Sequence, residues 1–521
     1  MDKKKNNIIS LGIYFFLAII SFFINFYIAS SGVYPVDTFI HYDSGFRILL
    51  GEHPIKDYWI VHGFLIDYIQ AIFFKIFGYN WYAYIIHSSF FNLIIVLFSY
   101  YIFDVLKINL FFNIFLCICI AILAYPVSGT PFLDLHSTYF SLISIYFAIL
   151  ATLKQKHFFW HWSAFFICVA FFCKQVPAAY TIIGLSITNL IFSFKEKNIK
   201  IIFYYATGVV LFLSLFILLL LFVKIDLKDL ILQFFLFPHS IGSSRYENYT
   251  LTFKNVFLDY KLIYLVLFFI IILNLKNMSK KYSESRYFKI FLLLLVLVIT
   301  SIFHQIYTKN QIYIFFLIPI CSAFVFFYIE LLNLNYKKII NIFVLIICLY
   351  STIKYNQRFN LERKFHELSN TDISKAIDAS KIHPKLKGLN WISPIFKDPQ
   401  EEVDYIKAFL NILEKDDENK MLISQYNFFS SILEQKLYSP SRTYDSISYP
   451  KKNTKYYKKY KSHLENLIKK NKIKKIFIFA PYSNYNLNHM LFNYIPENCF
   501  EKEKINNHLL KLEIKKCNGI L

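Results

Sequence analysis

Several features that mark common enzyme classes are missing from this sequence. It contains no P-loop, GxSxG, HExxH or GxGxxG motif, which argues against a nucleotide-driven pump. No CxxC pair or Cys/His spacing suggests a zinc site. With only 12 Gly and 14 Pro, the chain is not of low complexity. The first apolar run lacks a small-residue cleavage site, so we interpret it as a membrane span and not as a cleavable signal.

Long apolar runs dominate what is present. Hydrophobic residues make up 56% of the 521 residues, whereas soluble domains have about 45–50%. The excess lies in runs of about 15–25 residues, long enough to cross ~30 Å of hydrocarbon. We therefore expect an α-helical polytopic membrane protein with about eleven transmembrane helices, at 8–28, 81–103, 111–125, 136–153, 159–173, 177–193, 200–223, 260–275, 288–303, 311–330 and 338–353.

The net charge of +22 comes largely from short basic loops between these runs, so we expect no nucleic-acid partner. The N-terminal tip and four alternate loops hold most of the Lys and Arg, namely Lys154/Lys156, Lys195/Lys197/Lys200, Lys276 through Arg286 to Lys289, and Lys337/Lys338. By the positive-inside rule the N-terminus is cytoplasmic. An odd number of spans then places residues 354–521 in the periplasm, as expected of a bacterial inner-membrane protein.

Two further apolar segments complicate this topology. Residues 59–78 are apolar enough to tempt a transmembrane assignment, and a crossing there would invert every later loop. Asp67, Gln70 and Lys75 occur within the segment at helical spacing, so we predict a helix that lies in the membrane interface. We expect the same of residues 226–238 on the outer face.

The polar tail predicts a separate domain. Strand-like runs at 420–426 and 472–481 alternate with helical patterns at 400–415 and 455–471, which predicts a small α/β domain. We therefore divide the chain into a transmembrane domain at 1–353, with a first outer loop at 29–80, and a periplasmic domain at 354–521. In that compartment Cys499 and Cys517 can form a disulfide.

The first outer loop carries the densest polar pattern. It contains six acids and histidines beside the membrane: Asp37, His41, Asp43, His53, Asp57 and His62. Later it reads RILLGEHPIKDYW and FFKIFG. Loop acids are usually only solvated, but one held in place can accept a proton from an attacking hydroxyl or amine.

This arrangement resembles the GT-C superfamily of membrane glycosyltransferases, of the protein mannosyltransferase and aminoarabinose transferase type. Those proteins have an acidic motif after the first span, a helix ending near LLxGxxPYxD, and a helix ending in FxxFG, which match Asp37, the segment around Gly51, and Gly78. The resemblance implies sugar transfer from a polyprenyl-phosphate carrier, with Asp37 as base and Asp43 as second choice. Many members have Asp-Glu where this chain has Asp37-Thr38, which weakens a two-carboxylate metal site.

Two later segments fit the same function. In GTPFLDLHSTYF, Asp134 and His136 start a span, where ionisable groups usually line a cavity. The resemblance implies that Asp134 is a third catalytic acid, which assists the first loop or holds a metal. The alternative is a polar helix start capped by Ser137 or Thr138. In FFCKQVPAAY, Lys174 and Gln175 lie between two apolar runs. Lys174 can either reach the interface with its amine or, as the resemblance implies, neutralise the carrier phosphate.

Two weaker candidate segments follow. The segment FPHSIGSSRYENYT offers His239 and Arg245 on a flexible loop that can close over a donor, or that is simply solvated. The segment FHQIYTKNQIY offers His304, Tyr307, Lys309 and Gln311, which the resemblance implies contact the donor. The expected substrate-binding set is His41, Asp57, His136, Lys174, Gln175, His239, Arg245, His304 and Lys309.

Three functions remain open from the sequence. The first is a glycosyltransferase of the cell envelope with a polyprenyl-phosphate-linked sugar donor, a lipid, glycan or protein acceptor, and a divalent cation as an open cofactor. The second is a lipid-carrier flippase or transporter, although no paired broken helices or inverted repeats are visible. The third is an O-antigen polymerase or ligase, although this chain has its large loop first and its soluble domain last. Membrane lipids are expected partners in each case.

Overall fold

The computed structural model describes residues 2–247, 251–278, 286–308, 314–445, 447–481 and 488–515. Its contacts divide the chain into two compact units. Unit 1 comprises Met1–Ala29, Ile85–Ile217 and Tyr249–Phe365. Unit 2 comprises Ser30–Tyr84, Leu218–Asn248 and His366–Leu521.

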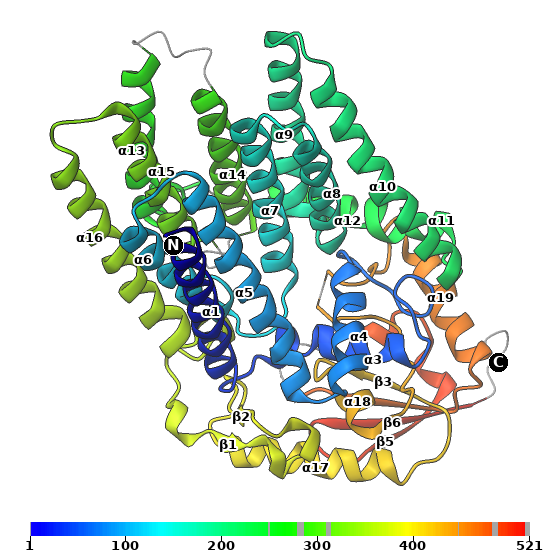
Figure 1. Cartoon of the computed structure of the whole chain (residues 1–521). Coiled ribbons are helices and arrows are strands. Elements are labelled where there is room, and N and C mark those ends of the chain that lie inside the picture. Colours follow the sequence, from blue (N-terminus) through cyan, green and yellow to red (C-terminus); the bar gives the residue numbers. More distant parts are fainter. Residues whose placement is uncertain are drawn as a thin grey trace. The chain divides into compact units, whose positions relative to one another are not determined.

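Unit 1 is built from long helices that run alongside one another (Figure 1). They are α1 (Asp2–Ile28), α5 (Trp81–Val105), α6 (Leu110–Leu123), α7 (Leu133–Lys154), α8 (Phe158–Cys173), α9 (Gln175–Lys195), α10 (Lys200–Val223), α13 (Lys261–Met278), α14 (Arg286–Thr308), α15 (Leu317–Leu332) and α16 (Lys337–Tyr355). Each of the eleven apolar runs thus contains a helix. In an apolar environment the backbone N–H and C=O groups must bond within the segment, and a helix satisfies them.

Eight of the described helices are long and apolar enough to cross a membrane. Three shorter apolar helices, at Phe158–Cys173, Lys261–Leu275 and Leu317–Leu332, correspond to the remaining predicted runs. At 1.5 Å per residue, a 16-residue helix spans only about 24 Å of a hydrocarbon layer about 30 Å thick. The eight long apolar helices make the described chain a helical protein of multi-pass membrane type.

Helix α7 lies at the centre of unit 1. It packs against α8, α9 and α14, and 94% of its most apolar window is buried. By contrast, the corresponding windows of α1 and α10 are only 17% and 28% buried. On α10 the side chains of Phe203 and Val210 are more than 60% exposed. Apolar surface of this kind is stable when lipid tails cover it.

Unit 2 contains shorter elements. Its helices are α2 (Pro35–Thr38), α3 (Ile40–Leu49), α4 (Leu65–Phe77), α11 (Leu227–Leu230), a π-helix at Ile231–Leu236, α12 (Phe237–Glu247), α17 (Pro399–Glu414), α18 (Phe429–Leu433), α19 (Tyr457–Lys470) and α20 (Asn488–Phe492). Its strands are β1 (Ile377–Asp378), β2 (Asn390–Trp391), β3 (Lys420–Ser424), β4 (Lys475–Phe479), β5 (Phe500–Lys504) and β6 (Leu509–Ile514).

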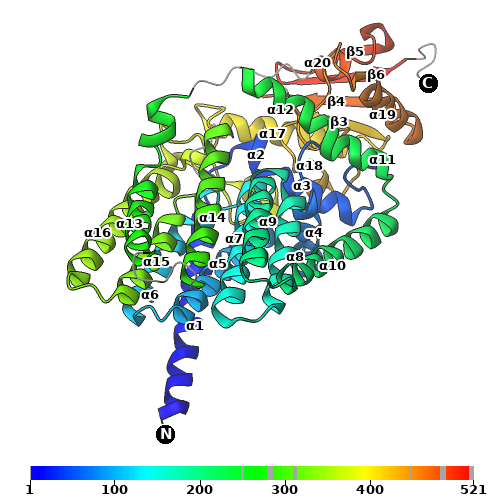
Figure 2. The same cartoon turned by 90° about the horizontal axis from the view of Figure 1, so that it is seen from above.

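A four-stranded sheet organises the C-terminal part of unit 2 (Figure 2). Its order is β3-β4-β6-β5, with β3 and β4 parallel and the other pairs antiparallel. Alternate residues of β3 and β4 enter a core with α19, including Met421 and Leu464. On the opposite face, Phe409 of α17 stacks on Phe479 with ring centroids 4.7 Å apart. Helices on both faces explain why β3 is buried at every position.

The strand runs at 420–426 and 472–481 and the two helical patterns of the tail are confirmed as β3, β4, α17 and α19. Strands β5 and β6 were not predicted. The segment FEKEK is charged at four of five positions, and these four side chains are exposed in β5. Without an apolar alternation the sequence offers no strand signal there, and pairing with β6 supplies the stability instead.

Nearly all of the first outer loop, predicted at 29–80, lies in the segment Ser30–Tyr84, which groups with the C-terminal segment in unit 2. Val33 N donates to Ile392 O at 2.9 Å, and Trp59 N donates to Pro440 O at 2.9 Å. The Trp59 ring belongs to the apolar core on the α19 face of the sheet. This division differs from the sequence-based boundary at residue 353, which kept the loop with the transmembrane domain.

Two predicted segments differ from expectation. Residues 237–247, expected as a flexible loop, form α12, because Phe237 packs on Trp59 at 5.5 Å between ring centroids. In the segment 59–78 only Leu65–Phe77 is helical. Asp67 and Gln70 are fully buried in unit 2, whereas Lys75 is exposed beside apolar side chains. Two of the three polar residues at helical spacing therefore face protein.

Candidate functional site

Three side chains from separate segments meet in unit 1, and two of them contact the carboxylate of the third. Asp134 lies in the first turn of α7, Lys174 between α8 and α9, and His304 near the end of α14. Lys174 Nζ lies 2.6 Å from Asp134 Oδ2, and His304 Nε2 donates to Asp134 Oδ1 at 2.8 Å. The side chains of Asp134, His304 and Lys174 are 2%, 1% and 14% exposed. We call these three residues the Asp134 cluster.

The break between α8 and α9 places Lys174 in the cluster. Lys174 has an extended backbone, with φ −158° and ψ 132°, so the chain leaves one helix before it enters the next. Its carbonyl accepts a hydrogen bond from Ser137 Oγ at 3.1 Å. Ser137 therefore anchors the break and does not cap α7, whose N-cap Phe132 makes no side-chain cap hydrogen bond. Because the ammonium pairs with Asp134, Lys174 does not extend to the interface.

A second buried polar chain lies on the same helix. His136 Nε2 is 2.9 Å from His87 Nε2, and His136 Nδ1 is 2.5 Å from the hydroxyl of Tyr125. In each pair one atom must carry the hydrogen and the other must accept it, and the Tyr125 hydroxyl can donate to His136 Nδ1. All three side chains are fully buried. The chain Tyr125–His136–His87 can thus pass a proton along connected hydrogen bonds.

Unit 2 contains its own buried charge cluster, centred on Asp67 of α4. Its Oδ1 lies 2.6 Å from His41 Nδ1 of α3, and its Oδ2 accepts from Arg442 Nη1 at 2.8 Å. Burial lowers the pKa of His41 below its ordinary value, although the hydrogen bond to Asp67 opposes the shift. A neutral His41 that donates from Nδ1 presents Nε2 as an acceptor, and Nε2 has no hydrogen-bond partner among the described residues.

Asp43, the second choice for a base, belongs to a neighbouring network. Burial raises its pKa, and the Arg47 guanidinium, 3.8 Å away, acts in the opposite direction. Arg47 also donates to Glu52 at 3.0 Å and to the Ser439 carbonyl at 2.9 Å. Its guanidinium lies 4.0 Å from the centre of the Tyr58 ring. Through the bond from Arg47 to Ser439 the network attaches α3 to the C-terminal segment, so these charges stabilise the fold of unit 2.

The other predicted residues of the first loop are dispersed within unit 2. Asp37 lies in α2 and is half-buried. Asp57 accepts from the His53 backbone N–H at 3.0 Å and pairs with Lys470 at 3.3 Å. Those contacts close a turn and attach it to α19. His62 is half-buried.

Four predicted residues contribute less to the described geometry. Gln175 is the first residue of α9, and His239 is exposed on α12. Arg245 lies in α12, and its side chain is outside what the structure describes. Lys309 lies outside the described residues, as do Gln311 and Cys517. Cys499 is disulfide-bonded.

Sequence reasoning missed the buried arginines. The chain uses Lys almost throughout, and its Arg residues are only Arg47, Arg245, Arg286, Arg358, Arg363 and Arg442. Arg47, Arg363 and Arg442 are at most 3% exposed, and each donates to backbone carbonyls. A guanidinium supplies a rigid fork of donors that Lys lacks. In a chain that otherwise uses Lys, the few Arg positions were therefore the sequence signal for buried cations.

Neither the described side chains nor the comparison with known proteins assigns a metal ion or a protein family to this site. No group of three or more His, Cys, Asp or Glu side chains that could hold a metal ion occurs within the described residues. No protein-family model matches the chain, and no curated protein sequence matches it either.

Proposed function

We propose that the chain is an integral-membrane glycosyltransferase that uses a polyprenyl-phosphate-linked sugar, with the Asp134 cluster at the site of the carrier phosphate. One observation carries the proposal. Asp134, Lys174 and His304 come from three separate polar segments of the sequence, and their side chains form one hydrogen-bonded cluster.

The position of the cluster supports this function. Asp134 starts α7, and Lys154 ends it about 30 Å away, given 1.5 Å per residue. The basic loops that contain Lys154 and Arg286 thus lie at the opposite end of unit 1 from the cluster. If the basic end faces the cytoplasm, the Asp134 cluster faces outward. Donors that are used on the outer face must arrive on a lipid, since nucleotide sugars are cytoplasmic.

The chemistry requires a cation and a base. The acceptor oxygen loses a proton to a carboxylate and bonds to the anomeric carbon of the sugar, while the bond from that carbon to the phosphate oxygen breaks. The polyprenyl phosphate leaves with the bonding electrons. Lys174 can pair with the carrier phosphate, whose charge rises from one in the diester donor toward two in the departing polyprenyl phosphate, so that the ammonium favours the leaving group. Asp134, held by His304, then serves as base.

Unit 2 supports an outer domain at a membrane surface. The exposed side of α4 carries Ile72, Ile76 and Phe77, each at least 48% exposed, together with the exposed Lys75. Apolar side chains beside a Lys whose amine can reach the headgroups suit a helix in the interface. The disulfide at Cys499 is typical of an oxidising compartment such as the periplasm.

The experiment follows product release. The full chain is reconstituted in vesicles with a radiolabelled sugar on polyprenyl phosphate and with envelope lipids as acceptor. Free polyprenyl phosphate and labelled product are measured. Wild type should release both, and Asp134→Asn should lose at least about 100-fold, the effect typical of a positioned acid–base group. The control is Asp104→Asn, an exposed acid of α5. Full activity of Asp134→Asn would exclude this carboxylate from the reaction. Asp37→Asn tests the base that the sequence resemblance implies.

A proton-coupled flippase or transporter is the second candidate. The buried chain Tyr125–His136–His87 favours it, because hydrogen-bonded ionisable groups inside membrane helices commonly relay protons. The same vesicles distinguish the two functions. Movement of intact labelled carrier across the bilayer, dependent on a pH gradient and without release of polyprenyl phosphate, would replace the transferase by the transporter.

A further inference from the structure

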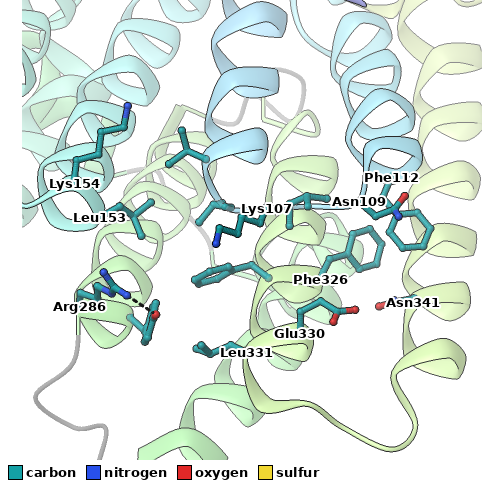
Figure 3. Close-up of a pocket in the computed structure, with 15 residues that line it drawn as sticks. Lys107, Asn109, Phe112, Leu153, Lys154, Arg286, Phe326, Glu330, Leu331 and Asn341 are labelled. Atoms are coloured by element: carbon teal, nitrogen blue, oxygen red, sulfur yellow. Dashed lines mark hydrogen bonds between the residues drawn. The ribbon is translucent and has the colours of Figure 1, made fainter. Parts of the chain in front are cut away.

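A cavity of about 700 Å³ lies at the basic end of unit 1, far from the Asp134 cluster (Figure 3). It is lined by the end of α5, the start of α6, the end of α7, the start of α14, the end of α15 and part of α16. Lys107, Lys154 and Arg286 lie around it, and Glu330 is the only acid among the described residues that line it. In Figure 3 the Lys107 side chain extends toward the side on which Arg286 lies.

The positive charge of this cavity is not neutralised by the described chain. The acid Glu330 pairs with Lys337 at 3.2 Å. Arg286 lies over the Tyr287 ring and donates to its hydroxyl, and Lys154 contacts the Tyr101 hydroxyl. Among the described residues, no carboxylate pairs with Lys107, Lys154 or Arg286. Three cations around one hollow favour an anion.

A neighbouring cavity of about 680 Å³ provides a contrast. It shares Arg286 and Tyr287 with the first and is also lined by Lys289 and Glu196. Lys289 is already paired with Glu196. The unneutralised charge therefore belongs to the first cavity, and Arg286 lies at the border of the two.

The walls identify the kind of anion. Phe112, Phe326 and Leu331 line the first cavity beside the cations. Next to its Asn109 rim, Leu110 and Phe111 of α6 are 48% and 67% exposed, so lipid tails would pass this opening. A freely soluble phosphate would use the cations but not the apolar walls. A phospholipid uses both.

We propose that this cavity binds the phosphodiester headgroup of an anionic membrane phospholipid, held by Lys107 and Arg286, with an acyl chain against α6. Arg286 presents a fork of donors to phosphate oxygens, and Lys107 adds a second charge. Basic pockets between helices on the cytoplasmic side are suited to such headgroups. The site is independent of the reaction proposed at Asp134.

The test measures lipid retained by the full chain. Wild type and Lys107→Gln/Arg286→Gln are purified in micelles with equal phosphatidylglycerol and phosphatidylcholine, and bound lipid is counted by mass spectrometry. Each basic group near an anionic surface contributes about fivefold, so the double variant should lose about 10- to 30-fold of the phosphatidylglycerol preference. The control is Lys200→Gln, an exposed residue of the basic loops that lines neither cavity.

Three results would overturn the site. They are equal retention of both lipids by wild type, an unchanged preference in the double variant, and an equal loss in Lys200→Gln. A further arm adds inorganic phosphate to the protein already loaded with phosphatidylglycerol. If phosphate displaces the lipid completely at equal concentration, the ligand is a soluble anion and the lipid assignment is wrong. Arg286→Lys, which keeps the charge, should retain part of the preference and shows that loss in the double variant is not misfolding.

Discussion

The ammonium of Lys174 lies 2.6 Å from Oδ2 of Asp134, although forty positions separate the two residues in the chain. Both belong to unit 1 and both are largely buried. A pair in such surroundings is costly to break, because either partner alone leaves a charge without compensation. Variants that remove one charge or both can therefore distinguish a structural role of this pair from a chemical one.

Replacement of Asp134 alone should destabilise the protein. Asp134→Asn leaves the Lys174 ammonium without its counter-ion, so we expect the free energy of unfolding to fall by about 3–5 kcal/mol. The double variant Asp134→Asn/Lys174→Met removes both charges and should recover most of this loss. Thermal unfolding of the purified full chain in detergent measures both effects. If the double variant recovers stability but not sugar transfer, the pair acts in the chemistry as well. A single variant as stable as wild type would contradict the buried pair.

The contact between α8 and α10 depends on one glycine. A Cβ atom at Gly208 would lie 2.0 Å from the His161 carbonyl oxygen and 2.9 Å from Ala164 Cβ. Small residues at such positions let membrane helices approach closely. Gly208→Ala should therefore destabilise unit 1 by about 1–3 kcal/mol, as overpacking does.

The matched control for this change is Gly12→Ala on α1. A Cβ atom there meets nothing within 4 Å, so Ala should be neutral or should stabilise by up to about 1 kcal/mol through helix propensity. Thermal unfolding of the two variants measures the difference. Equal stability of the two would show that α8 and α10 are not in close contact.

Arg442 should be necessary for the stability of unit 2. Its Nη1 donates to the Gly63 carbonyl at 2.9 Å and to Asp67 at 2.8 Å. Arg442→Ala leaves the buried Asp67 with His41 as its remaining partner, so we expect a loss of about 3–5 kcal/mol. Arg442→Lys keeps the charge but not the fork and should still lose more than Lys451→Ala, an exposed control in the same segment. Sensitivity to limited proteolysis at 30–84 measures the effect, and equal resistance of Arg442→Ala and the control would contradict it.

Unit 2 should lose stability as the pH falls below about 6.5. Burial lowers the pKa of His41 from its ordinary 6.5, and Arg442 opposes protonation further. Between the lowered value and 6.5 the unfolded chain binds a proton that the folded chain does not bind. The loss therefore begins as the pH falls through 6.5 and amounts to at most about 1.4 kcal/mol per pH unit.

The measurement is the unfolding temperature of unit 2 between pH 8 and pH 5. His41→Gln can still donate to Asp67 but does not titrate, so its profile should be flatter than that of wild type. His239→Gln, at an exposed position of α12, should keep the wild-type profile. Identical profiles for wild type and His41→Gln would assign the pH dependence to other groups.

Local pattern was enough to predict the elements with strong periodicity or long apolar runs. The eleven helices of unit 1, and α17, α19, β3 and β4, follow from it because each side chain's neighbours within about four positions decide whether it can be buried. The same reasoning failed for β5 and for α12. The first depends on the partner strand β6, and the second on the contact between Phe237 and Trp59.

The sequence by itself determined that Asp134, Lys174 and His304 are polar groups in costly surroundings. Only the tertiary structure decided that they meet, because packing of α7, α8, α9 and α14 brings positions as far as 170 residues apart within hydrogen-bond distance. It also decided that Asp67 of the first loop belongs with Arg442. A charged residue in an apolar run indicates that its side chain has a partner in the folded protein. Which residue is that partner depends on tertiary contacts, which the local sequence pattern does not contain.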